Sequence, residues 1–190
     1  MLTMRAMRGL PAVLVMLAGL VLAGCTTTTV TPEYVSKPQE PATGVAIGEL
    51  TADNELWALY LPYLRAGLVA ELRESNAFAQ VYDPAPETLP AQTVLLTGRL
   101  TEVDRGNRAA RWIIGFGAGR AKARGAFEIG GTDGTSLAKF ESWKAYSGGA
   151  GIGGADFLDM EDLVQELGKE TAGSVVRWSK GQPLEPPRED

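Results

Sequence analysis

Cys25 is the only thiol in the 190-residue chain, and the chain has no histidine. Without imidazole, neither a Ser-His-Asp or Cys-His triad nor a His-ligated metal site can form. A single cysteine excludes an internal disulfide and a paired-cysteine metal or redox site. The side chains left for catalysis are carboxylates, lysine, tyrosine and serine, and we expect no metal and no cofactor.

The residues before Cys25 have the layout of an export signal. Arg5 and Arg8 lie close to the start, and no acidic residue precedes Glu33. Residues 10–22 carry no charge, and they are fewer than the ~20 residues that a membrane-spanning helix needs. They have the length of the apolar part of a signal peptide. The segment Leu22-Ala-Gly-Cys25 that follows resembles the lipobox of bacterial lipoprotein signal peptides.

This resemblance implies that the chain is cleaved after Gly24 and that Cys25 carries a thioether-linked diacylglyceryl group and an N-acyl chain. Two lipid signals anchor a protein stably to a membrane. Because Thr26 follows the cysteine instead of an acidic residue, the resemblance implies the periplasmic face of the outer membrane of a diderm cell.

The composition divides the chain into four parts. Residues 1–24 are the expected signal peptide, and residues 25–41, rich in Thr and Pro, are the expected tether. Residues 42–180 are the expected periplasmic domain, and residues 181–190 are predicted to be a disordered tail. The domain is long enough for one modest core.

The domain is predicted to be α+β, with a mainly antiparallel sheet, two main helices and the order β-α-β-β-β-β-α. Strands are predicted at residues 43–50, 78–82, 93–104, 122–129 and 136–146, and helices at residues 54–75 and 156–180. Pro62 either kinks the first helix or marks its true start. In the strand at 122–129, Ala123, Gly125, Phe127 and Ile129 are predicted to share one face.

The chain has a formal charge of −5, yet the stretch between Asp104 and Glu128 contains six basic residues and no acidic one. It encloses the apolar, glycine-rich run Trp112-Ile-Ile-Gly-Phe-Gly-Ala-Gly119. Arginines around aromatic and β-branched side chains suit an anionic lipid, an anionic polymer or a partner subunit. The alternative is that the apolar residues cover a sheet face and the arginines are solvated. The Gly-x-Gly-x-Gly run lacks the strand-turn-helix context of a nucleotide site.

Residues 96–111 (LTGRLTEVDRGNRAAR) and 115–120 (GFGAGR) resemble the core of an uncharacterised family of proteobacterial lipoproteins that contain a domain of unknown function. The resemblance extends over about residues 43–180 and implies no catalytic residue. More distantly, the order of elements resembles the periplasmic domain of the curli-secretion lipoproteins, a likeness of fold alone.

We therefore expect a non-catalytic binding or envelope-assembly module, anchored to the membrane at Cys25, with no nucleic-acid partner. Its expected contact residues are Arg108, Arg111, Trp112, Phe116 and Arg120. One alternative is an envelope hydrolase that uses carboxylates such as Glu102 and Asp104, although neighbouring arginines are expected to pair with them. The other is a homo-oligomeric secretion or assembly component.

Overall fold

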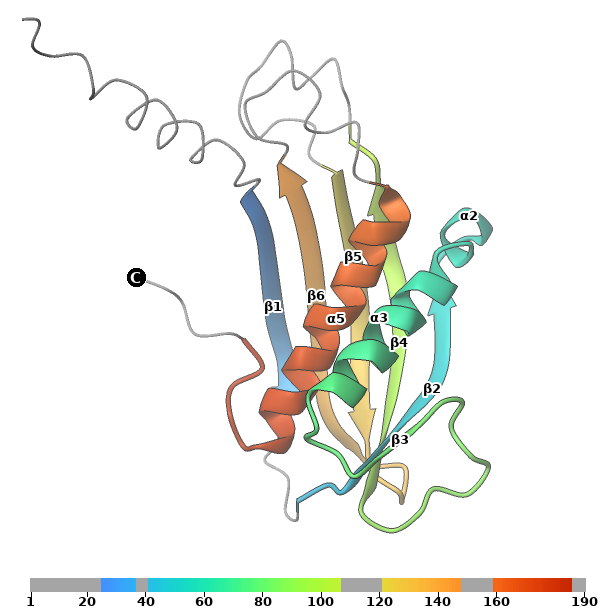
Figure 1. The fold of residues 1–190 in the computed structure, drawn as a ribbon, viewed down its shortest axis with the longest axis vertical. Helices are drawn as coiled ribbons and strands as arrows, with labels where there is room; N and C mark the ends of the chain where they lie inside the picture. The colour runs from blue at the N-terminus through green and yellow to red at the C-terminus, as the bar shows by residue number, and fades with distance from the viewer. Residues whose placement is uncertain (1–24, 37–40, 107–120, 148–158, 186–190) are drawn as a thin grey trace, which may run out of the picture.

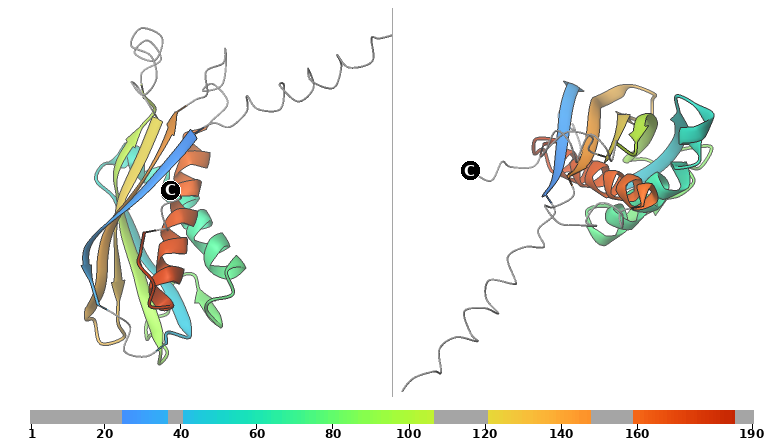
Figure 2. Two further views of the ribbon diagram at one scale, coloured as in Figure 1. Left: turned by 90° about the vertical axis from the view of Figure 1, so that its left-hand side faces the viewer. Right: turned by 90° about the horizontal axis from the view of Figure 1, so that it is seen from above.

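A computed structural model describes residues 25–36, 41–106, 121–147 and 159–185. Within these ranges, three helices and a six-stranded sheet form two layers, with the long helices α3 and α5 on one face of the sheet (Figures 1 and 2). The strands are β1 (Cys25–Val35), β2 (Gly44–Ala52), β3 (Gln80–Tyr82), β4 (Thr93–Asp104), β5 (Ala121–Gly130) and β6 (Ser136–Ser147). The helices are α2 (Glu55–Ala58), α3 (Leu61–Glu74) and α5 (Met160–Ser179). The predicted α+β class is confirmed.

The strands lie in the order β1-β6-β5-β4-β2-β3. β1, β6, β5 and β4 pair antiparallel with one another in that order, whereas β2 runs parallel to both β3 and β4. The parallel pairing follows from the chain path, because the α2–α3 segment returns the chain from the end of β2 to the start of the next strand. The five predicted strands are all present, and β1 is an additional one.

The helix-covered face of the sheet forms one wall of the core. Along β5, Ala123, Gly125, Phe127 and Ile129 are buried and the residues that alternate with them are partly exposed, which confirms the predicted alternation. Phe127 stacks on Phe140 of β6, with ring centroids 5.8 Å apart. Leucines of α3 and the apolar stripe of α5 complete this core.

The predicted helix at residues 54–75 is divided into α2 and α3. The Asn54 side chain accepts a hydrogen bond from the Trp57 backbone N–H at 2.9 Å and so caps α2. Pro62 lies in the first turn of α3, where the missing N–H costs nothing. The sequence left open whether Pro62 kinks a helix or marks the start of one. In the structure it marks the start of α3.

Helix α5 begins at Met160, a few residues later than predicted. The Asp159 side chain accepts a hydrogen bond from the Met160 N–H, and Glu161 and Asp162 lie in the first turn. Arg177 lies in the last turn. These charges match the polarity of the helix dipole.

The predicted tether is wrong for residues 25–35, because these residues form β1. The strand pairs with β6 from Cys25↔Ser147 to Val35↔Ala138, and Val30 is buried in the core. The β-branched threonines that made the segment look like a linker are also good strand formers. The sheet of the domain therefore includes β1, which lies before residue 42.

The predicted disordered tail is also wrong for its first residues. Leu184 is buried, and its carbonyl oxygen accepts hydrogen bonds from the Arg177 guanidinium at 2.8 and 3.0 Å. Residues 186–190 lie outside the described part of the chain.

Candidate functional site at the Cys25 end of the sheet

Four strand termini meet at one end of the sheet, which we call the Cys25 end. β1 begins there at Cys25, opposite Ser147 at the end of β6. β5 begins there at Ala121, which pairs with Tyr146, and β4 ends there with Asp104 opposite Lys122. In Figure 1 this is the upper end of the molecule.

Among the predicted site residues, Cys25 is placed by its backbone as the first residue of β1. Arg108, Arg111, Trp112, Phe116 and Arg120 lie outside the described residues. The chain leaves the sheet after Asp104, the last residue of β4, and returns to it at Ala121, the first residue of β5. Both residues lie at the Cys25 end. Cys25 and the two ends of the basic segment are therefore brought to the same end of the domain.

The α2 corner is a feature of this end that the sequence analysis did not single out. We use the name for α2 and its junction with α3, residues 54–63. Leu56 is 74% exposed, Leu59 is 70% exposed and Tyr63 is 40% exposed. The signal was present in the run LWALYLPYL (residues 56–64), which has more apolar residues than one buried helix face can hold.

A hydrogen bond from Arg105 connects the end of β4 to the α2 corner. The Arg105 guanidinium donates to the Tyr60 hydroxyl at 3.4 Å. This contact, together with the Coulombic effect of Tyr60, raises the pKa of Arg105 above its ordinary value. The arginine is fully exposed, so its charge is available to solvent and to anionic groups at this end.

An open hollow of about 560 Å³ lies beside the α2 corner, lined by Trp57, Thr101, Glu102, Val103, Asp104, Arg124 and Glu141. Glu102 forms ion pairs with Lys122 at 2.7 Å and with Arg124 at 3.8 Å. Asp104 accepts a hydrogen bond from the Gly106 N–H at 2.8 Å. The expected ion pairing of Glu102 is present, and among the described residues its partners come from β5.

Further pairs of opposite charge lie on the face of the sheet that the helices leave uncovered. Arg124 also approaches Glu141 at 3.6 Å, and Lys139 approaches Glu128 at 3.5 Å. These are cross-strand pairs of opposite charge between neighbouring strands, which support strand pairing. Their side chains are partly exposed, so each pair contributes little stability by itself.

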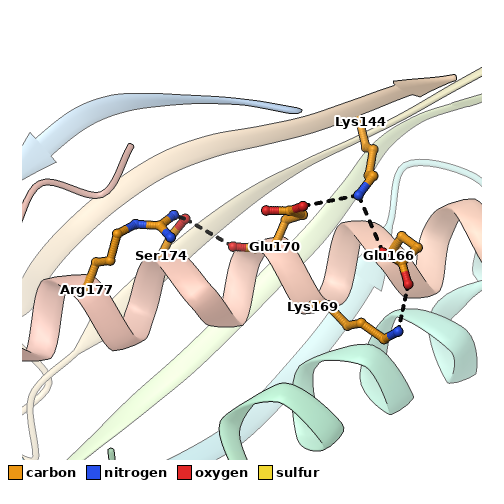
Figure 3. A network of polar contacts seen from close by, with 6 residues as sticks. All are labelled: Lys144, Glu166, Lys169, Glu170, Ser174 and Arg177. Carbon is orange, nitrogen blue, oxygen red and sulfur yellow. Dashed lines mark hydrogen bonds and ion pairs between the residues drawn. The ribbon is translucent and has the colours of Figure 1, made fainter. Parts of the chain in front are cut away.

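A second polar network lies between the sheet and α5 (Figure 3). Lys144 of β6 is 5% exposed, and its Nζ lies 3.1 Å from Oε1 of Glu170 and 3.5 Å from Oε2 of Glu166. Glu166 also accepts a hydrogen bond from Lys169 at 2.6 Å, which lowers the pKa of Glu166 and raises the pKa of Lys169. The network fixes α5 to β6.

This second network continues along α5 toward the C-terminus. Ser174 donates to the Glu170 carbonyl at 3.1 Å and accepts from Arg177 at 2.9 Å. Burial lowers the pKa of Arg177 below its ordinary value. The Trp178 indole N–H donates to the Ser36 carbonyl at 2.9 Å, which attaches α5 to the residue after β1. These contacts hold the helix in place.

Residues 29–150 match the family described as "Domain of unknown function (DUF4410)". The chain belongs to the DUF4410 family. The match takes in most of β1 and every other strand, together with α2 and α3, and α5 lies after it. The sequence-based assignment to an uncharacterised family is confirmed at this level, while the lipidation of this DUF4410 protein remains a prediction.

Two solved structures are similar to this chain at low identity. The PelC dodecamer from Paraburkholderia phytofirmans (space group P6) has a TM-score of 0.45 and 12% identity, covering 84% of this chain and 98% of that one. A dodecamer of a point variant of the same protein (space group C2) has a TM-score of 0.46 and 13% identity, covering 82% and 98%. A search of curated proteins gave no significant match.

Within the described residues of this DUF4410 chain, no three His, Cys, Asp or Glu side chains gather in a way that could hold a metal ion. None of the described helices is long and apolar enough to cross a membrane.

Proposed function

We propose that this DUF4410 protein is a lipid-anchored protein of the periplasmic face of the outer membrane that acts by binding or assembly. The observation that carries the proposal is the position of Cys25. The residue that completes the lipobox-like sequence is also the first residue of β1, at the end of the sheet where the basic segment leaves and rejoins it.

The proposed contact residues are Arg108, Arg111, Trp112, Phe116 and Arg120. The arginines supply charge and bidentate hydrogen bonds to carboxylate or phosphate groups, and the two aromatic residues supply apolar area. Support comes from the ends of the segment: Gly106 and Ala121 both lie at the Cys25 end, and Arg105 is exposed there with its full charge.

A non-catalytic role is supported by the ion pairs of Glu102, one of the two carboxylates considered for a hydrolase. Both carboxylate oxygens of Glu102 already have protein partners at the edge of an open hollow, Lys122 on Oε1 and Arg124 on Oε2. Glu102→Gln is therefore expected to leave the cellular function of the protein intact. Loss of that function in a folded Glu102→Gln variant would support the hydrolase alternative.

The test of the binding proposal is charge reversal in cells. Arg108, Arg111 and Arg120 are changed together to Glu, and the protein is crosslinked and recovered from membranes. The matched control changes Arg73, Lys139 and Lys180 to Glu, because these exposed residues give the same change of net charge elsewhere on the domain. The partner or lipid should be lost only with the first variant, and equal recovery with both variants would overturn the proposed surface.

The homo-oligomeric alternative is favoured by one observation, the outer edge of β1. This eleven-residue strand is at the edge of the sheet, so it offers unpaired backbone groups to another strand. Light scattering during size-exclusion chromatography of residues 26–190 distinguishes a monomer from a homo-oligomer. A clean monomer argues against assembly by the polypeptide alone.

A further inference from the structure

The α2 corner exposes more apolar surface than the fold requires. Leu56 and Leu59 are among the most exposed large apolar side chains of the described residues, and Tyr63 lies beside them at the start of α3. Helix α2 has no buried residue, so these leucines contribute little to the core. A cluster of exposed apolar residues is typical of a contact surface.

The corner is nevertheless held in a defined conformation. Asn54 caps α2, and the Tyr60 N–H donates to the Trp57 carbonyl at 2.9 Å. Trp57 is partly buried at the wall of the hollow, and Arg105 holds Tyr60 from the end of β4. The two leucines are therefore presented by a fixed turn at the edge of the sheet.

The α2 corner lies at the Cys25 end. It follows the end of β2, which runs parallel to β4, and both strands end there. Figures 1 and 2 show α2 and the start of β1 toward the same end of the molecule. Because β1 pairs with β6 from its first residue, no free linker separates Cys25 from the sheet.

We propose that the α2 corner lies against the lipid surface, with Leu56 and Leu59 in the interfacial layer and Tyr63 beside them. The inference rests on the proposed lipid anchor. A lipid on Cys25 holds the first residue of β1 at the membrane, and the direct pairing of that residue in the sheet turns the whole Cys25 end toward the bilayer. Leucines flanked by tyrosine and tryptophan suit the boundary between headgroups and acyl chains.

The charges at the corner define the kind of lipid contact. The charges around the corner have both signs: Asp53, which pairs with Arg99 at 3.2 Å, and Glu55 precede Leu56, while Arg105 bonds to Tyr60. The contact depends on apolar burial, and it should persist in vesicles without anionic lipid and at high salt.

The opposite end of β1 offers a matched control. Tyr34 is 52% exposed and Val35 is 45% exposed, so they resemble the α2 corner in exposure and apolar character. Val35 pairs with Ala138 near the start of β6, about 30 Å along the strand from Cys25. They should stay in water when the Cys25 end faces the bilayer.

The experiment uses the full chain, processed in cells and reconstituted into phosphatidylethanolamine–phosphatidylcholine vesicles that contain brominated lipid. Leu56→Cys, Leu59→Cys and Tyr34→Cys are made singly and labelled with an environment-sensitive fluorophore. The label is specific because the only native thiol, Cys25, is blocked when it carries the lipid. Intact mass reports lipidation, and sedimentation reports attachment to the vesicles.

We expect lipidated protein on the vesicles, with quenching by brominated lipid at positions 56 and 59 at least about twofold stronger than at position 34. Attached protein with equal quenching at all three positions overturns the inference and leaves the anchor standing. Labels at 56 and 59 that both brominated lipid and aqueous iodide fail to reach also overturn it, because a protein then covers the corner. Unlipidated protein that stays in solution overturns both the anchor and the inference.

Discussion

Cys25 and Ser147 are opposite residues in the pairing of β1 with β6. The residue predicted to carry a lipid is thus the first residue of an edge strand, with no intervening linker. A lipid at that position would restrain the orientation of the whole sheet, because β1 is joined to β6 along its length. The structure therefore connects the proposed membrane attachment with the fold.

Removal of β1 should destabilise the domain strongly. Residues 42–190, the domain as composition alone would define it, lack Val30 and the Ser36 carbonyl that accepts from Trp178. Burial of a valine contributes about 1.5–3 kcal/mol, so residues 42–190 should be less stable than residues 26–190 by at least about 2 kcal/mol. Urea unfolding of the two fragments measures the difference, and equal midpoints with equal slopes would show that β1 is dispensable.

The crossing of α3 and α5 should not tolerate a methyl group. A Cβ on Gly67 would lie 2.0 Å from the Gln165 carbonyl oxygen, and one on Gly168 would lie 2.4 Å from the Leu64 carbonyl oxygen. Gly67→Ala and Gly168→Ala should each cost about 1–3 kcal/mol, despite the better helix propensity of alanine.

Gly173→Ala is the control for this prediction, because it lies on the same helix as Gly168 and its Cβ would meet only Arg177 Nη1, at 3.5 Å. This variant should be neutral or gain up to about 1 kcal/mol. Thermal unfolding of the three variants measures these differences in stability. A Gly168→Ala protein as stable as Gly173→Ala would contradict the close approach of the two helices.

Glu166 should add stability that is lost in acid. Its hydrogen bond from Lys169 lowers the pKa of the folded state below the ordinary value of 4.5, so the unfolded chain binds a proton first. The contribution is present above about pH 4.5 and disappears as the pH falls through the lowered pKa. It should be below about 1 kcal/mol, because the side chain is partly exposed.

Unfolding free energies measured between about pH 3 and pH 6 test this contribution. Glu166→Gln should flatten the acid side of the profile, whereas Glu87→Gln, which changes an exposed carboxylate in the 83–92 loop, should retain it. Parallel profiles for Glu166→Gln and the unmodified chain would show that the hydrogen bond has no effect on stability.

Local patterns in the sequence were sufficient for most of the elements. The alternation around Phe127 and the helical stripe of α5 come from side-chain periodicity, which short segments display on their own. These features need no knowledge of what lies across the fold.

The missed features depend on contacts between distant segments. Nothing in the threonine run shows that β6 needs a partner on its open edge, and nothing in residues 181–185 shows that Arg177 will bond to the Leu184 carbonyl. The α2 corner was missed because residues 54–75 were predicted as one helix, whereas the structure divides them into α2 and α3. The proposed contact residues between 108 and 120 lie outside the described part of the chain and stay a prediction.

The central claim is that a lipid on Cys25 holds the domain at the membrane. Intact-mass analysis of the protein extracted from cell membranes tests it most directly. We expect a chain that begins at Cys25 and carries the added mass of a diacylglyceryl group and an N-acyl chain. We also expect a Cys25→Ser variant to keep its signal peptide or to leave the membrane. A mature chain that begins elsewhere, or an unmodified Cys25 thiol on membrane-bound protein, would contradict it.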